Sequence, residues 1–196
     1  LPEKPLPLML ALVYELVDGG WDVDDVISYM HTGLTGLDTG ECDILEAYVF
    51  KWQLRGWAWE RDRDWRQHPD GFAGEYDDAA NARLDMINAL RVKLSGPLLR
   101  FRQRSGEAET ALAQAQALAG LFEDMKLPAT LEIRAAELSA HGRAELASEY
   151  QQLWDIVVSA LEQCAAILGD TPMTRAEFGR LFSLMLSKYD VGTIPV

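Results

Sequence analysis

The sequence has few of the residues on which redox chemistry, metal binding and membrane insertion depend. Of its 196 residues only two are cysteine, three are histidine and 18 are basic. No apolar run reaches the roughly 18 to 20 residues that a membrane helix needs. The first 17 residues contain Glu15 and lack both the basic-then-apolar plan and the cleavage site of a signal peptide. We therefore expect a soluble, cytoplasmic protein with no membrane partner.

The cysteines and histidines are too few and too scattered for a metal centre. Cys42 and Cys164 fall within apolar helical patterns, which favours buried thiols over a disulfide or a ligand pair. His31, His68 and His141 are far apart and form no HExxH pair, so we interpret each as a surface or capping residue. The sequence predicts neither redox chemistry nor a metal site.

Motifs for phosphate binding and nucleophilic catalysis are missing as well. The nearest glycine-rich stretch, Thr32–Gly36, has no following lysine and is interpreted as a turn between helices. The acids at 22–25 resemble a calcium loop without its turn glycine and closing glutamate, and a solvated helix start explains them better. No Gly-x-Ser-x-Gly elbow is present. We predict no catalytic, cofactor-binding or metal-binding residues, although pairs of carboxylates for acid–base chemistry stay open.

What the chain has instead is helical periodicity over most of its length. Hydrophobic residues make up 48% of the sequence, enough for a sizeable core, and they recur at three- and four-residue steps. The predicted helices cover about 6–17, 22–33, 39–56, 75–103, 107–127, 129–140, 143–168 and a last stretch from 174. Gly96–Pro97 is expected to kink or split the long one. The fold class is all-α, an irregular antiparallel helical array that forms a single domain over 1–196.

The periodicity fails between Gly56 and Gly74, which makes this segment a candidate lobe boundary. Trp57, Trp59 and Trp65 alternate there with charged residues, among them Arg61, Arg63 and Arg66. Two interpretations of the tryptophans remain open. They anchor the segment in the core, or they form a patch that faces a partner.

Charge is unevenly distributed along the chain. The formal net charge is -13, which opposes nonspecific attraction to phosphate backbones, yet residues 51–104 carry 11 bases against 8 acids. Within them, the run 91–104 has five bases and no acid: Arg91, Lys93, Arg100, Arg102 and Arg104. These cations either follow a nucleic-acid backbone, with Phe101 available for stacking, or pair with acids of neighbouring helices.

The ends of the sequence suggest a piece of something longer. The first residue is Leu1 rather than methionine, and residues 193–196 have the pattern of an extended segment that has been cut short. We therefore expect a fragment of a larger chain.

Five stretches of the sequence resemble AddB, the family of B subunits of the bacterial AddAB helicase-nuclease. They are VISYMHTGL (26–34), ECDILEAYVFKWQLRG (41–56), ASEYQQLW (147–154), LGD (168–170) and YDVGTIP (189–195). They occur in the family's order and span nearly the whole chain. The resemblance implies that the chain is a helical insertion in the helicase-like half of such a subunit, comparable to the 2B subdomain of UvrD-like helicases.

The resemblance also implies a parent activity. With an AddA-type partner, an AddB-type subunit resects double-strand breaks for recombinational repair, using ATP, magnesium and an iron-sulfur cluster. Its phosphate loop, nuclease carboxylates and four cluster cysteines match sequence outside these 196 residues, so none of the family's functional residues is carried over.

Three hypotheses follow. The first is a non-catalytic module that packs against the AddA-type subunit or guides double-stranded DNA through the full complex. The second is a DNA-binding module that uses the run 91–104, and the third is a free-standing helical protein. The candidate contacts to DNA or a partner are Arg91, Lys93, Arg100, Arg102, Arg104, Trp57, Trp59 and Trp65.

Overall fold

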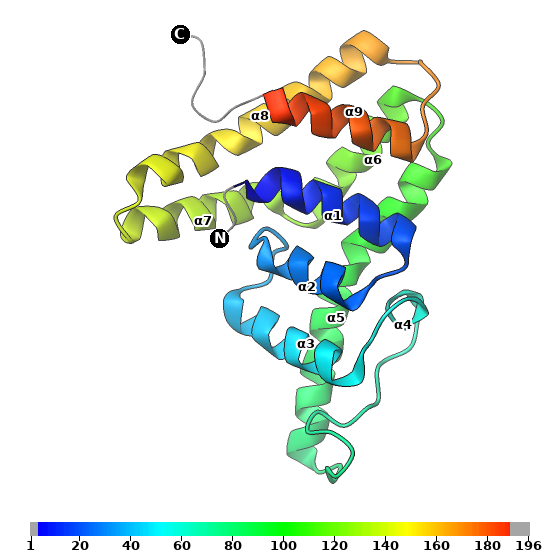
Figure 1. Cartoon of the computed structure of the whole chain (residues 1–196), viewed down its shortest axis with the longest axis vertical. Coiled ribbons are helices and arrows are strands. Elements are labelled where there is room, and N and C mark those ends of the chain that lie inside the picture. Colours follow the sequence, from blue (N-terminus) through cyan, green and yellow to red (C-terminus); the bar gives the residue numbers. More distant parts are fainter. Residues whose placement is uncertain (1–3, 189–196) are drawn as a thin grey trace.

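The computed structural model describes residues 4–188, and these residues form nine helices and no strand (Figure 1). The all-α prediction is confirmed, whereas the likeness to a 2B subdomain stays a prediction. The helices are α1 (Pro5–Gly19), α2 (Val23–His31), α3 (Thr39–Trp52), α4 (Trp57–Glu60), α5 (Asp78–Glu107), α6 (Ala111–Asp124), α7 (Leu127–Ala140), α8 (Ala144–Leu168) and α9 (Arg175–Lys188). The extended pattern noted at 193–196 lies outside the described residues.

Side-chain caps start the helices where the sequence predicted them. Asp22 accepts a backbone N–H of the first turn of α2, and Asp38 forms a capping box with Glu41 at the start of α3. A capping box also begins α9, because Thr174 and Glu177 exchange hydrogen bonds between side chain and backbone. These bonds from Thr174 hold the pKa of the Glu177 carboxyl below its usual range. Local sequence therefore fixes where these three helices begin.

Helix α5 begins and ends three to four residues later than the predicted 75–103, and Pro97 lies inside it. Of the two outcomes expected at Gly96–Pro97, a kink or a split, the split does not occur. An interior proline costs roughly 3 kcal/mol, because it removes a hydrogen bond and its ring crowds the preceding turn. Leu94 and Leu98, on either side of the proline, are 2% and 0% exposed in the same core. Burial of both flanks keeps the helix continuous.

The other helices are arranged around α5, which runs along most of the molecule (Figure 1). Helix α3 packs against its first half, α4 packs beside its middle, α6 folds back beside its second half, and the α7–α8 hairpin packs on α6. Helices α1 and α9 lie next to each other over this assembly. One connected core of buried residues includes contributions from the long helices and from the segment between α4 and α5.

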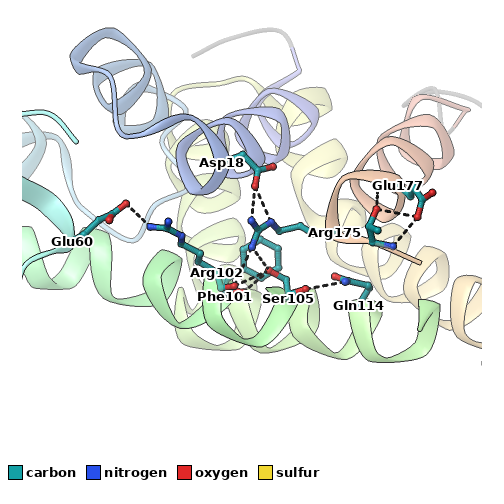
Figure 2. A network of polar contacts seen from close by, with 9 residues as sticks. Asp18, Glu60, Phe101, Arg102, Ser105, Gln114, Arg175 and Glu177 are labelled. Atoms are coloured by element: carbon teal, nitrogen blue, oxygen red, sulfur yellow. Dashed lines mark hydrogen bonds and ion pairs between the residues drawn. The ribbon is translucent and has the colours of Figure 1, made fainter. Parts of the chain in front are cut away.

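A single arginine joins three helices that are distant in sequence (Figure 2). The guanidinium of Arg175, in α9, donates to the Asp18 carboxylate of α1 at 3.0 and 2.6 Å. It also donates to the Arg102 carbonyl at 3.1 Å and to the Ser105 hydroxyl at 3.2 Å, both on α5. Nearby, a Cβ added at Gly179 would lie only 2.8 Å from the Tyr14 ring, so α9 and α1 approach closely. The junction sets how α1 and α9 sit on α5.

Replacing Arg175 with alanine should lower the free energy of unfolding by about 2 kcal/mol. The side chain is only 21% exposed, and hydrogen bonds to charged groups typically contribute about 1.5–3 kcal/mol. Urea denaturation followed by circular dichroism measures the change. Arg180→Ala is the matched control, because Arg180 lies exposed on the same helix, and its change should stay within about 0.5 kcal/mol. Equal losses in both variants would contradict the role assigned to Arg175.

Candidate nucleic-acid and partner surfaces

All five cations of the basic run 91–104 pair with carboxylates of neighbouring elements. The pairs are Arg91–Asp64 at 3.2 Å, Lys93–Glu41 at 2.8 Å, Arg100–Asp124 at 2.9 Å, Arg104–Asp124 at 3.1 Å and Arg102–Glu60. They connect α5 to α3, to α4, to α6 and to the segment after α4. Of the two interpretations of this run, pairing within the chain is the one that the structure shows.

Two residues of the run are also too buried to meet a polyanion. The Arg91 side chain is 7% exposed and lies against the Trp65 ring, with its guanidinium carbon 5.6 Å from the ring centroid. Phe101 is 0% exposed and packs edge-on against Tyr14. The interpretation in which Phe101 is available for stacking on a nucleic acid is therefore excluded. Its position on α5 points it into the core, which the charges around it in sequence do not reveal.

Asp124 receives two arginines of the run at once. Burial raises the pKa of the Asp124 carboxyl, but the guanidiniums of Arg100 and Arg104 outweigh this effect, and the net result is a pKa below the usual range. The carboxylate side chain is 24% exposed. The two ion pairs hold the end of α6 against the second half of α5.

The three tryptophans of the segment 56–74 do not share one environment. Trp59 and Trp65 are 0% exposed and pack edge-on with ring centroids 4.8 Å apart. Trp59 also stacks on Trp21 at 5.5 Å. The core interpretation holds for these two residues. Trp57 is 69% exposed, with the Arg61 guanidinium 4.6 Å from its ring centroid, and it alone of the three lies on the surface.

The segment is locked to α5 by Asn88, a residue that was not among the candidates from sequence. The Asn88 side chain accepts the backbone N–H of Trp65 at 2.8 Å and donates to the Trp65 carbonyl at 3.0 Å. The Trp65 indole N–H donates to the Ala58 carbonyl at 2.9 Å. The sequence does contain a signal for this role, because Asn88 is a polar residue on the apolar side of the helical pattern. This clamp gives an irregular segment a defined position.

A groove lies along this segment, with a volume of about 800 Å³. Its lining combines arginines and aromatic rings: Trp52, Arg61, Arg63, Asp64, Arg66, Gln67, His68, Gly71, Phe72, Gly74 and Tyr76. The alternation of tryptophan and arginine is visible in the sequence. The candidates chosen from the sequence were nevertheless the tryptophans and the cations of the run 91–104, and not the arginines of this segment. The groove itself was missed because its aromatic wall comes from residues 72–76 and from α3.

The burial of the cysteines and histidines can be compared with the predictions from the sequence. Cys42 and Cys164 are buried and free, as predicted, and burial raises the pKa of the Cys42 thiol to about 11. His68 is only 4% exposed and lies at the end of no helix, so the expectation of a surface or capping residue is wrong for it. His31 and His141 are exposed, and His141 caps the end of α7.

Metal-binding clusters and membrane helices are both missing from the described part of the chain. Among residues 4–188, no group of three or more His, Cys, Asp or Glu side chains is placed to hold a metal ion. No helix in the same range has the length and apolar character required to cross a membrane.

Comparison with known proteins gives one consistent result. No family model matches the chain. The chain is 27% identical over 98% of its length to the B subunit of the ATP-dependent helicase/deoxyribonuclease of Clostridium botulinum strain Langeland. It is 30% identical over 97% of its length to the proteins of that name from Ruminiclostridium cellulolyticum and Desulforudis audaxviator. The resemblance to AddB is thereby confirmed, and the chain spans 17% of the length of each of these relatives.

Replacing Asp124 with asparagine should lower the free energy of unfolding at pH 7 by about 1 kcal/mol, because partly exposed ion pairs contribute roughly 0.2–1 kcal/mol each. The Asp124 pKa is lower in the folded than in the unfolded protein, so its contribution is present above the unfolded pKa, about 3.9, and is lost as the pH falls through the folded value. The difference between Asp124→Asn and wild type should therefore shrink below about pH 4. Urea titrations across the pH range measure it.

Asp85→Asn is the control for this experiment, because Asp85 is an exposed acid on α5. Its substitution should change stability by less than about 0.5 kcal/mol at any of these pH values. A pH-independent loss in Asp124→Asn would contradict the ion-pair explanation.

Proposed function

We propose that this chain is a non-catalytic helical module of an AddB-type subunit, within an ATP-dependent helicase/exonuclease that resects DNA double-strand breaks for recombinational repair. The observation that carries the proposal is the alignment. Nearly the whole chain matches one continuous part, 17% of the length, of proteins named as the B subunit of a helicase/deoxyribonuclease. The module's role in this proposal is to pack the subunits of the complex together.

The ion pairs favour packing over guidance of duplex DNA. A surface that follows a phosphate backbone needs cations that exchange counterions for phosphates. The cations of the run 91–104 already have carboxylate partners within the chain. Binding DNA there would require breaking these interhelical pairs first.

The cysteines of this chain do not fit the iron-sulfur cluster of the proposed parent protein. A four-cysteine iron-sulfur cluster does not fit a chain with two cysteines, one buried on α3 and one on α8. Cys42 is directed to the Met30 carbonyl and Cys164 to the Met185 sulfur. In the proposal, ATP, magnesium and the cluster are held by other parts of the AddB-type subunit.

A face formed by α3 and α5 has the composition of a packing surface. Ile44 and Met86 are 41% and 52% exposed and line the same hollow of about 180 Å³. Lys51 and Arg83 lie at this hollow as well, which gives it an apolar centre with charged residues around it. Interfaces between subunits commonly combine such a centre with a polar rim. We assign this face to the AddA-type subunit.

The purified chain should neither hydrolyse ATP nor cleave DNA above the buffer control. Linear duplex DNA with magnesium and ATP is the substrate, and gel analysis and phosphate release are the measurements. Magnesium-dependent cleavage by the chain, abolished by substitution of its own carboxylates, would overturn the non-catalytic assignment.

The double variant Ile44→Asp/Met86→Asp should weaken binding to the AddA-type subunit of the same organism by at least about tenfold, because charges would be buried in an apolar contact. Sedimentation velocity or calorimetry of the mixture measures the affinity. Ile133→Asp/Ile167→Asp is the matched control, since it adds the same two charges at exposed residues of α7 and α8, and it should change the affinity by less than about threefold. Absence of binding by the wild-type chain, or equal losses in both variants, would refute the assigned face.

A further inference from the structure

The groove beside the segment between α4 and α5 is a strongly basic hollow that the ion pairs leave uncovered. Three arginines line it, Arg61, Arg63 and Arg66, against one carboxylate, Asp64, which is already paired with Arg91. Its volume of about 800 Å³ falls within the range of roughly 300–1,000 Å³ typical of ligand sites. The loop that forms it runs from α4 to the end of the molecule where α5 begins (Figure 1).

The arginines of the groove differ from those of the run 91–104. Within residues 4–188, the structure gives neither Arg63 nor Arg66 an acidic partner, and both are exposed. Arg61 lies over Trp57, and its buried Nε has no hydrogen-bond partner among the described residues. The segment between α4 and α5 contains four further acids, Asp62, Asp70, Glu75 and Asp77, of which Asp70 pairs with Arg83 and Asp77 caps α5. These guanidiniums are therefore free to bind an anion from outside the chain.

Aromatic rings line the groove together with the arginines. Phe72 is 97% exposed and meets Trp52 edge-on, with ring centroids 4.7 Å apart. The Trp52 indole N–H donates to the His68 carbonyl at 3.1 Å, which fixes the supporting ring. Tyr76 is 57% exposed, and its hydroxyl donates to the Arg66 carbonyl at 2.7 Å. The Phe72 ring is almost fully exposed and is supported by the fixed Trp52 ring, so it offers a free π-face to a ligand.

The wall that carries these rings is held by a buried histidine. His68 Nδ1 accepts the backbone N–H of Asp70 at 3.0 Å, so Nε2 carries the proton and donates to the Glu75 carbonyl at 2.8 Å. The imidazole also meets Tyr76 edge-on at 4.9 Å. A Cβ added at Gly74 would lie 2.0 Å from His68 Nδ1, so the chain passes tightly over the ring. The groove is a positioned feature of the fold.

From this arrangement we infer that the groove binds a single-stranded segment of nucleic acid. The guanidiniums of Arg61, Arg63 and Arg66 contact its phosphates, and an unpaired base stacks on Phe72. Combined arginine contacts and base stacking are the general basis of single-strand binding. A duplex fits less well, because its base faces are covered by their neighbours and leave Phe72 without a partner. The inference goes beyond packing against another subunit and does not depend on it.

The test measures binding of a fluorescein-labelled oligothymidylate of about 12 nucleotides to the chain by fluorescence anisotropy. Three phosphate contacts predict a slope of about -2 for the logarithm of the binding constant against that of the salt concentration. Arg63→Glu/Arg66→Glu should weaken binding at least about tenfold and flatten this slope. Phe72→Ala should weaken it about 5- to 150-fold, the range for losing one stacked base, and leave the slope unchanged.

Matched controls separate the groove from the charge of the chain as a whole. Arg143→Glu/Arg180→Glu makes the same change in net charge at exposed arginines beside α8 and on α9, and its affinity should stay within about threefold of wild type. Circular dichroism and thermal unfolding establish that each variant is folded. A blunt duplex of the same length should bind more weakly than the oligothymidylate.

Several results would overturn the inference. They are no salt-dependent binding of the oligothymidylate by wild type, equal losses in the two double variants, a duplex that binds as well as the single strand, or no effect of Phe72→Ala. An acidic peptide such as polyglutamate that binds more tightly than the oligothymidylate at the same sites would assign the groove to a protein partner instead. Because none of these measurements includes an AddA-type subunit, their failure leaves the proposed packing role to its own test.

Discussion

Helix α5 carries a row of cations whose carboxylate partners come from the elements packed around it, and the arrangement of the chain depends on this row. Lys93 reaches Glu41 on α3, Arg102 reaches Glu60 on α4, and Arg100 reaches Asp124 on α6. The carbonyl of Arg102 accepts a hydrogen bond from Arg175 of α9, which also binds Asp18 of α1, so these two helices are joined to α5 (Figure 2). The basic run 91–104 looks like a nucleic-acid binding site in the sequence. In the structure, its ion pairs orient the helices around α5.

These pairs select an arrangement more than they supply stability. Partly exposed ion pairs contribute roughly 0.2–1 kcal/mol each, whereas fully burying one large apolar side chain contributes about 1.5–3 kcal/mol. The core contains Trp21, Trp59 and Trp65, each 1% exposed or less, together with aliphatic residues from most of the helices. Apolar burial thus drives the collapse, and the pairs determine how the helices are placed once collapsed.

The sequence predicted most of the helices because their signals are local. Caps such as Asp38 and apolar residues at helical spacing depend only on neighbours along the chain. The continuity of α5 through Pro97 and the burial of Phe101 have no local signal, since both depend on packing against residues that are distant in sequence. The groove was missed for the same reason. Its aromatic wall, Trp52 and Phe72, becomes adjacent only when the segment after α4 folds back along α3.

Net charge is a poor guide to anion binding in this chain, because what matters is which cations remain after folding. The overall charge of -13 argues against polyanions, and the run 91–104 argues for them, yet folding neutralises the run and leaves Arg63 and Arg66 uncovered. At roughly physiological ionic strength, charges more than about 8 Å away are largely screened. A phosphate in the groove therefore responds mainly to the charges that line it, three arginines and Asp64, and the acids on the other helices affect the approach of a strand more than its bound state.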